Sequence, residues 1–295
     1  MIEEIMEKIK ESELVLQPNG NIYHLNLNPE NLAHDIIVVG DPGRVPVVSK
    51  YFDKIEFQTH NREIYTHTGI FNNKRITVLS TGMGTDNLDI VINELDALVN
   101  IDLKERTIKE KHTSLNIVRL GTSGALQADI PVDSLMMSTH GLGLDGLLNF
   151  YKVENGIIDE ALTEAFIRQT GWDANLAKPY VVKCSEALEN KMGDGLLKGI
   201  TATASGFYGP QGRELRLKLA HPDMNEKIEN FEFRGQKIVN FEMETSALYG
   251  LSALLGHQAL TICAIIANRV IKQFSSDHEK VMENLIQQVL QRLTK

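Results

Sequence analysis

The chain has 295 residues, 42% of them hydrophobic and 23% charged, with a formal net charge of −9. This length suits one large α/β domain with a substantial core. The acidic balance argues against a nucleic-acid-binding protein, which needs a basic face. No apolar run approaches the roughly 20 residues that span a bilayer, and the N-terminus lacks the apolar segment of a signal peptide. We therefore expect a cytoplasmic protein without nucleic-acid or membrane partners.

The two cysteines, Cys184 and Cys263, each lie in an apolar run (YVVKCS and LTICAIIA). Such positions favour buried, reduced thiols, and two isolated cysteines do not form a disulfide framework. No cluster of histidine and cysteine has zinc-site spacing. The sequence therefore predicts no metal site.

The predicted elements alternate between strands and helices along the chain. Residues 1–13 resemble a short surface helix, which begins an N-terminal helical extension over 1–20, and residues 14–34 form an irregular lead-in. The stretch DIIVVGDPGRV then predicts a buried strand, a Gly/Pro turn and the start of a helix. Further strands are predicted at 54–59, 63–71, 74–81, 115–124, 133–139, 178–184, 198–205, 238–244 and 258–267, and helices at 86–100, 158–169, 245–255 and 278–294.

Strands that alternate with helices predict an α/β fold with a mixed central sheet flanked by helices. No linker-like stretch divides the chain, so we expect a single domain over residues 1–295. Ligands in such folds gather where strands end in loops. Polar residues at strand ends are therefore the candidates for a functional site.

The first such strand end is the stretch from Gly40 to Arg44 (GDPGR). A glycine turn at a helix start presents backbone N–H groups, and Arg44 adds a positive charge, which suits phosphate. The same residues also make a good structural turn. The sequence leaves both interpretations open.

The second strand end runs from Arg119 to Gly124 (RLGTSG). Arg119 lies within an otherwise buried strand, where an unpaired guanidinium would be costly. Thr122 and Ser123 offer hydroxyl groups, and the glycines allow close backbone approach. The alternative to an anion site is an arginine paired with an internal carboxylate.

The third strand end runs from Phe207 to Arg213 (FYGPQGR). The Gln211 amide can donate to and accept from one edge of a flat heterocycle. Arg213 only donates, so it favours a carbonyl oxygen that gains negative charge. Phe207 can stack on a ring. A polar surface loop is the competing interpretation.

The fourth strand end contains Glu242, Met243 and Glu244. Residues 242 and 244 have strand period, so both carboxylates can point to the same side and accept ribose hydroxyls. Alternatively, they form an acidic pair favoured by the dipole of the following helix. Two further stretches, Asn21–His24 and Asn61–Glu63, carry polar residues that surface or packing roles also explain. The glycine-rich turn from Ser80 to Thr85 either supplies backbone donors or only closes a tight turn.

These motifs, in this order, resemble the nucleoside phosphorylase-I family, and its uridine phosphorylase branch most closely. The resemblance rests on YHLNL, VVGDPGRV, NREIYTHTG, VLSTGMG, VRLGTSGAL, GFYGPQGREL, NFEMETSALYGL and IIANRV, and covers the chain from about Asn21 onward. It implies a phosphorylase/hydrolase-like domain whose sheet is partly closed like a barrel. It also implies a reaction of pyrimidine salvage, in which phosphate converts uridine to uracil and ribose 1-phosphate, with deoxyuridine and thymidine as alternative substrates.

The resemblance also implies the residues of the site and its partners. Phosphate would be held by Gly40, Arg44, Arg119 and Thr122, with Arg62 from a neighbouring subunit. Ribose would be held by Thr122, Glu242, Met243 and Glu244, with His24 from the neighbour. The base would be held by Ser123, Gly124, Phe207, Gln211 and Arg213. Catalysis would depend most on Arg119, Gln211, Arg213 and Glu244.

The shared site implies a homo-oligomer, either a dimer or a hexamer of dimers. The reaction needs inorganic phosphate as co-substrate and no cofactor. By the same resemblance, Glu63 and Ser80 are the candidates for a structural monovalent cation at the dimer interface.

Two alternatives share the fold, and a third is a different class of protein. Purine phosphorylases generally place an aspartate after the late strand, where this chain has Asn268. Nucleosidases use water and dispense with the phosphate arginines, which are present here. A non-catalytic nucleoside-binding protein would show a broken phosphate site.

Three features depart from the family pattern. Asp86 follows the second glycine-rich turn, where it can cap the helix that begins there. The chain also has about twenty extra N-terminal residues and longer segments around 101–113 and 150–195, which could alter subunit packing or cover the site.

Overall fold

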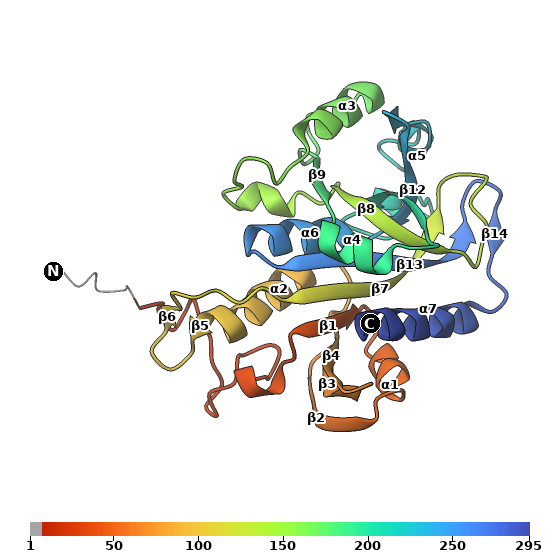
Figure 1. The fold of residues 1–295 in the computed structure, drawn as a ribbon. Coiled ribbons are helices and arrows are strands. Elements are labelled where there is room, and N and C mark those ends of the chain that lie inside the picture. The colour runs from red at the N-terminus through yellow and green to blue at the C-terminus, as the bar shows by residue number, and fades with distance from the viewer. Residues whose placement is uncertain (1–7) are drawn as a thin grey trace.

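A computed structural model describes residues 8–295 (Figure 1). Residues 1–7 of the predicted N-terminal helix lie outside the described residues. Residues 8–20 contain turns rather than a helix, because the backbone bonds elsewhere. The Ile9 amide donates to the Arg106 carbonyl at 2.8 Å, and the Arg106 guanidinium donates to the Leu14 carbonyl. The segment is therefore held against the hairpin of residues 101–108.

The sheet is mixed and partly closed, as expected. Its twelve strands run in the order β11-β12-β10-β8-β13-β7-β1-β4-β3-β2, with β9 beside β8 and β14 beside β13. The sheet closes because β12 pairs with β7 as well as with β10, placing Asn240 opposite Ala125. β7, β13, β8, β10 and β12 therefore form a small barrel, and β1, β4, β3 and β2 extend from it as an open arm.

Most strand bounds lie within two residues of the predicted stretches, but β8 extends four residues further than expected, and the short strands β11 and β14 were not predicted. The sheet contains β1 (Asp35–Val39), β2 (Lys54–Asn61), β3 (Ile64–Phe71), β4 (Lys74–Ser80), β7 (Asn116–Ala125), β8 (Leu135–Gly143), β9 (Tyr180–Lys183), β10 (Leu197–Thr203), β11 (Glu232–Phe233), β12 (Gln236–Glu242), β13 (Gln258–Asn268) and β14 (Gln273–Phe274). A separate hairpin, which the sequence did not predict, consists of β5 (Ile101–Asp102) and β6 (Thr107–Ile108).

The four predicted longer helices are present, each within two residues of its expected ends. The helices are α1 (Arg44–Ser49), α2 (Thr85–Asn100), α3 (Glu160–Thr170), α4 (Glu186–Met192), α5 (Met224–Glu229), α6 (Thr245–Leu254) and α7 (His278–Leu293), with 3-10 turns η1 (Pro29–Asn31), η2 (Leu147–Phe150) and η3 (Gly209–Gln211). The prediction that Asp86 caps α2 is wrong. Gly84 is the N-cap and makes no side-chain cap bond, while Asp86 lies in the first turn.

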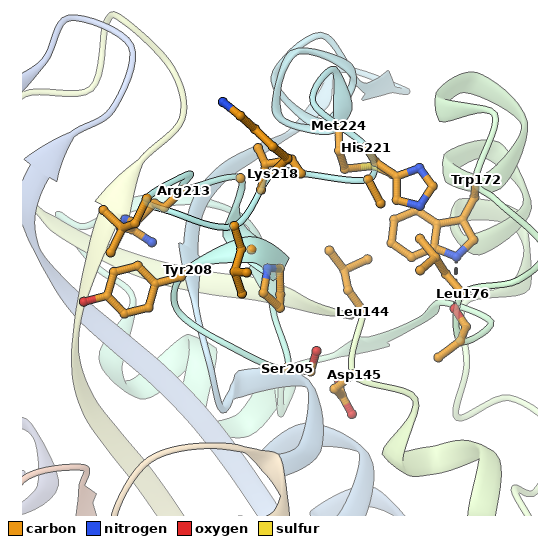
Figure 2. Close-up of a pocket in the computed structure, with 18 of the residues that line it drawn as sticks. Leu144, Asp145, Trp172, Leu176, Ser205, Tyr208, Arg213, Lys218, His221 and Met224 are labelled. Carbon is orange, nitrogen blue, oxygen red and sulfur yellow. Dashed lines mark hydrogen bonds between the residues drawn. The ribbon is translucent and has the colours of Figure 1, made fainter.

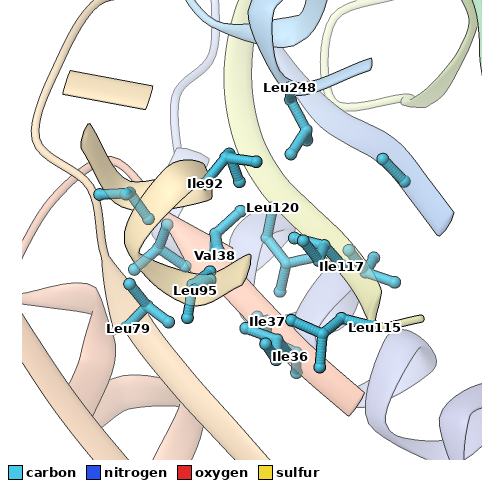
Figure 3. Close-up of a cluster of buried hydrophobic side chains, with 14 of the residues drawn as sticks. Ile36, Ile37, Val38, Leu79, Ile92, Leu95, Leu115, Ile117, Leu120 and Leu248 are labelled. Atoms are coloured by element: carbon cyan, nitrogen blue, oxygen red, sulfur yellow. The ribbon is translucent and has the colours of Figure 1, made fainter. Parts of the chain in front are cut away.

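The main core lies between the open arm, the barrel and the helices that cover them. Figure 1 shows β13 and β7 crossing the middle of the molecule with α7 beneath them, and α7 packs on both strands. Figure 3 shows side chains of β1, β7 and α2 meeting in one cluster. Leu88, Val91, Ile92 and Leu95 are fully buried, as their helical spacing predicts. This packing fixes the strand ends that carry the candidate site.

Both cysteines are free and buried. Burial raises the pKa of the Cys184 thiol to about 12 and that of the Cys263 thiol to about 11. Because the thiolate is the reactive form, we expect dithionitrobenzoate to leave the native protein unmodified at about pH 8 and to titrate two thiols after unfolding in guanidinium. Rapid reaction of the native protein would contradict this burial.

Across residues 8–295, no helix has the length and apolar character needed to cross a membrane. The same residues contain no group of three histidine, cysteine or acidic side chains arranged to hold a metal ion.

Candidate functional site

The anion end of the site forms where β1, β4 and β7 end side by side. These strands are parallel neighbours, so their C-terminal turns meet at one edge of the sheet. The Thr81 amide donates to the Val39 carbonyl at 2.8 Å, and a Cβ on Gly40 would lie 3.4 Å from the Gly82 carbonyl oxygen. The two glycine-rich turns therefore lie in van der Waals contact, and a Cβ at position 40 would touch the second turn.

Two guanidinium groups lie close together at this end. Arg44, at the start of α1, is partly buried and donates to the Leu120 carbonyl at 3.3 Å. Burial and the nearby Arg119 charge both lower the pKa of Arg44. Across residues 8–295 no carboxylate lies within 4.0 Å of the Arg44 guanidinium, so its charge is the one that favours a bound anion here.

Arg119 pairs with both carboxylates of the fourth strand end. Its Nη1 lies 3.2 Å from Glu242 Oε2, and its Nη2 donates to Glu244 Oε2. Burial opposes the charged guanidinium, but the Glu244 and Glu242 carboxylates outweigh it and raise the pKa of Arg119. The alternative of an internal ion pair is therefore present in the structure. That Arg119 binds phosphate stays a prediction. It requires that the cluster of Arg119, Glu242 and Glu244 can also accept an anion.

The carboxylates of Glu242 and Glu244 differ in the number of hydrogen bonds that they accept from the protein. Glu242 accepts hydrogen bonds from the Glu244 and Thr245 amides at the start of α6 and from Thr203 Oγ1 at 2.7 Å. This is the helix-start arrangement that a helix dipole favours. Glu244 accepts one amide, that of Gly84 at 2.8 Å, besides Arg119. Glu244 therefore retains more accepting capacity for a ligand than Glu242.

The base end of the site is built by η3 and the residues around it. Gln211 is 3% exposed, so the surface-loop alternative does not describe its side chain. Arg213 Nη1 donates to Gln211 Oε1 at 2.7 Å and to the Phe207 carbonyl at 2.6 Å. The Arg213 guanidinium lies over the Phe207 ring, 3.8 Å from its centroid. These contacts hold the amide and the guanidinium beside each other, as the sequence pattern predicted.

Arg269 also lies at the base end, although it was not among the predicted site residues. Its Nη2 donates to the Gln211 carbonyl, and its stem packs so closely on Gly124 that a Cβ there would lie 3.2 Å from Arg269 Cδ. Its Nη1 is buried and has no hydrogen-bond partner within residues 8–295. Burial and the neighbouring Arg213 lower the pKa of Arg269 to about 10. The available signal was an arginine directly after an apolar strand.

Asn268 has a structural role. Its Nδ2 donates to the Gln127 and Ile130 carbonyls, both at 2.9 Å, and its Oδ1 accepts from the Val270 amide. All of these partners are backbone groups, so the side chain fixes the turn after β13. The late-strand position that separates purine phosphorylases in the family pattern thus carries no acidic group here.

β7 links the two ends of the site. It carries Arg119 at the anion end and Gly124 at the base end, roughly 16 Å apart along an extended strand. Between them, Thr122 is partly buried, and Ser123 Oγ accepts from Asn240 Nδ2 at 2.8 Å inside the barrel. Side chains that reach inward from both ends can therefore contact one small ligand.

His24 and Arg62, the residues predicted to act from a neighbouring subunit, lie in two different parts of the chain and make different contacts. His24 Nδ1 lies 2.5 Å from Glu94 Oε1 of α2, and the same carboxylate accepts the His24 amide. Arg62 is exposed at the β2–β3 turn with φ of 53°. Beside it, Ser80 Oγ donates to the Glu63 carbonyl at 2.6 Å. The structure brings Glu63 and Ser80 together, and the cation that they would hold stays a prediction.

A cavity of about 820 Å³ adjoins the base end (Figure 2). Arg213 and Tyr208 line one side of it, and Trp172 and His221 line the opposite side. Arg119, Glu242 and Glu244 are not among its lining residues. The cavity is therefore distinct from the anion and carboxylate cluster.

Comparison with known proteins identifies relatives over almost the whole chain. The family model of the phosphorylase superfamily matches residues 35–295. The uridine phosphorylase of Thermococcus kodakarensis is 30% identical over 284 residues, which cover 94% of this chain and 88% of that protein. A DeoD-type purine nucleoside phosphorylase of Clostridium perfringens is 28% identical over 261 residues, covering 87% of this chain and 91% of that protein.

A solved structure gives the same picture. A Trypanosoma brucei nucleoside phosphorylase that shows uridine phosphorylase activity superposes with a TM-score of 0.85 and 31% identity. The match covers 95% of this chain and 99% of that chain. The resemblance read from the motifs and the predicted fold class are both confirmed.

Proposed function

The chain belongs to the phosphorylase superfamily, and from this premise we propose that it is a nucleoside phosphorylase, a pentosyltransferase, whose substrate is uridine. Phosphate attacks the anomeric carbon, and the products are uracil and ribose 1-phosphate. The similar proteins from Thermococcus kodakarensis and Trypanosoma brucei support uridine as the substrate.

The observation that carries the choice of a pyrimidine is the composition of the base end. Gln211, Arg213 and Arg269 offer an amide and two guanidinium groups within one set of hydrogen bonds. Uracil presents carbonyl oxygens and a ring N–H, which match donors together with an amide oxygen. A purine phosphorylase would instead benefit from a proton donor at position 268, where the Asn268 amide is committed to backbone carbonyls.

The proposed chemistry follows from how charge develops as the glycosidic bond breaks. The sugar becomes cation-like and the uracil ring becomes anion-like. Phosphate, held between the Gly40 turn, Arg44, Arg119 and Thr122, stabilises the sugar charge and supplies the nucleophile. The guanidinium groups of Arg213 and Arg269 stabilise the charge on the ring, as an oxyanion hole does. Holding the reactants in line supplies much of the acceleration, and no covalent enzyme intermediate is needed.

Glu244 is the carboxylate that we assign to the ribose hydroxyls. Its oxygens have fewer protein donors than those of Glu242, and Arg119 offsets its charge. Burial raises the pKa of Glu244 while Arg119 opposes this rise. Glu242 instead holds Arg119 and the start of α6 in position. Met243, between them and partly buried, would contact the sugar ring.

We propose that the active protein is at least a dimer with a shared site. Arg62 is exposed, and the His24 side chain, although paired with Glu94 of α2, is still 27% exposed, which leaves both residues accessible to a neighbouring chain. Inorganic phosphate is the co-substrate, and we propose no organic cofactor. Two free, buried thiols are compatible with the reducing cytoplasm, the compartment that we propose.

A mixed dimer tests the shared site. Arg62→Ala and Arg213→Ala chains, each with its own affinity tag, are co-expressed and the doubly tagged species is purified. Each variant alone should lose most of its activity. A mixed dimer contains one site with both wild-type residues, so it should recover about half of the wild-type rate per dimer. Absence of recovery would show that Arg62 and Arg213 serve the same chain's site.

A panel of nucleosides tests the function directly. Uridine, deoxyuridine, thymidine, inosine and adenosine are incubated with and without phosphate, and free base is measured. We expect uracil release from uridine that depends on phosphate. Release without phosphate would indicate a nucleosidase, and hypoxanthine or adenine release would indicate the purine branch.

A further inference from the structure

The cavity of about 820 Å³ lies behind the turn that carries the base-binding residues. The η3 turn separates it from the Gln211 side chain, because Gly209, Pro210 and Gly212 line the cavity and Gln211 does not. Figure 2 shows an open space bounded by Tyr208 and Arg213 on one side, Trp172 and Leu176 on the other, and Leu144 below. A volume of this size is typical of sites for small organic ligands.

The walls of the cavity are mainly apolar, and part of that surface is exposed to water. Leu144, Trp172, Leu176 and Met224 form walls from the end of β8, the loop after α3 and the start of α5. Leu215 and Leu217, on the segment that crosses the cavity, are 74% and 81% exposed. Large exposed leucines beside an apolar hollow are a feature of binding sites. A ligand in the cavity would shield both leucines from water.

The charges around the cavity favour an anion. Its lining includes the cationic side chains Arg213, Arg216 and Lys218, of which Lys218 is paired with the Glu214 carboxylate at 2.6 Å, and one acidic residue, Asp145. The Asp145 carboxylate already accepts hydrogen bonds from Tyr180 and Ser246, at 2.8 Å each. Among residues 8–295, no carboxylate lies within 4.0 Å of the Arg216 guanidinium. The cavity rim is therefore more positive than the protein as a whole, whose net charge is −9, and a local positive potential attracts anions.

We propose that this cavity is a second binding site, for an amphipathic aromatic anion that places its rings against Trp172 and Leu144 and its charge against Arg216. A planar aromatic body buries the apolar walls at little cost in conformational freedom, since it has few rotatable bonds. A carboxylate or sulfonate group pairs with a guanidinium in the fork geometry that arginine provides. The site borders the proposed nucleoside contacts at Arg213 and is separate from the phosphate contacts.

The probe 1-anilinonaphthalene-8-sulfonate tests this proposal, because it is an aromatic anion that fluoresces in apolar surroundings. Trp172 is the only tryptophan of the chain and lines the cavity, so energy transfer reports whether the probe binds near it. We expect one probe per chain, with quenching of Trp172 and matching sensitised emission. Binding without energy transfer from Trp172 would overturn the assignment.

Two variants and a neutral analogue test the chemistry of the ligand. Arg216→Glu should weaken probe binding by at least about tenfold, because it replaces the pairing charge with a repelling one. Arg234→Glu is the matched control, since exposed Arg234 lies on the β11–β12 turn outside the cavity lining. Leu217→Gln removes apolar surface beside the cavity and should weaken probe binding several-fold. Because Leu217 is exposed, we expect this substitution to leave the folded protein stable.

N-Phenyl-1-naphthylamine has the same rings without the sulfonate, and should bind more weakly than the probe. Equal binding of this analogue, or equal effects of Arg216→Glu and Arg234→Glu, would overturn the proposal. These measurements use no nucleoside. They therefore stand or fall independently of uridine phosphorolysis, which is assayed separately.

Discussion

Replacing Arg119 by methionine is expected to lower the free energy of unfolding by about 3–5 kcal/mol. The side chain is 6% exposed and is the counter-charge of both Glu242 and Glu244. Its removal leaves two buried carboxylates without a cation, and an uncompensated buried charge is far more costly than a missing ion pair. Urea unfolding followed by circular dichroism measures the change.

A combined variant separates this electrostatic cause from simple loss of packing. Arg119→Met with Glu242→Gln and Glu244→Gln removes the stranded charges, and should recover much of the lost stability. Lower pH should also help the single variant. The pKa of a buried, unpaired carboxyl is raised in the folded state, so the protein takes up a proton on folding and is relatively more stable in acid. A combined variant as unstable as Arg119→Met at all pH values would contradict the argument.

Replacing Arg213 by alanine is expected to reduce kcat for uridine by about 10²- to 10³-fold, equivalent to about 2.7–4 kcal/mol of transition-state stabilisation. Charge on the uracil ring is largest in the transition state, so a donor to its carbonyl oxygen acts mainly there. Steady-state kinetics at saturating phosphate should therefore show kcat falling more than KM rises.

The fold should tolerate this change, because Arg213 makes hydrogen bonds to Phe207 and Gln211 but, among residues 8–295, no ion pair. Arg234→Ala, which removes an exposed arginine far along the chain at the β11–β12 turn, is the control and should leave kcat unchanged. If Arg213→Ala raised KM and left kcat unchanged, Arg213 would bind the nucleoside equally well in the ground state and in the transition state. An unchanged rate would remove Arg213 from the proposed mechanism.

The elements with a strong periodic pattern were predictable from the sequence. DIIVV forms buried β1, and the apolar face of 86–100 forms the buried face of α2. α4 and α5 were missed because helices of six or seven residues show less than two turns of period. Residues 8–13 have a helix-like composition, but Ile9 bonds to Arg106, a partner nearly one hundred residues away. Local propensity could not anticipate that contact.

The sequence predicted which residues lie in the candidate site better than it predicted which of them bond to one another. Gln211 and Arg213 lie together, as a spacing of two suggested. The choice of partner for Arg119 depended on where β7 and β12 meet, and that pairing joins Ala125 to Asn240. Arg269 was overlooked because a single arginine after a strand is ordinary in a sequence. Its importance appears only when its guanidinium reaches the Gln211 carbonyl.

Besides its proposed contact with ribose, Glu244 connects two helices. It is the N-cap residue of α6, and it accepts the amide of Gly84, the N-cap residue of α2. The two helices pack against each other. The Glu244 side chain thus ties the start of α2 to the residue at which α6 begins. A nucleoside that draws this carboxylate toward its hydroxyls should weaken its bond to the Gly84 amide, and hydrogen exchange at that amide should become faster.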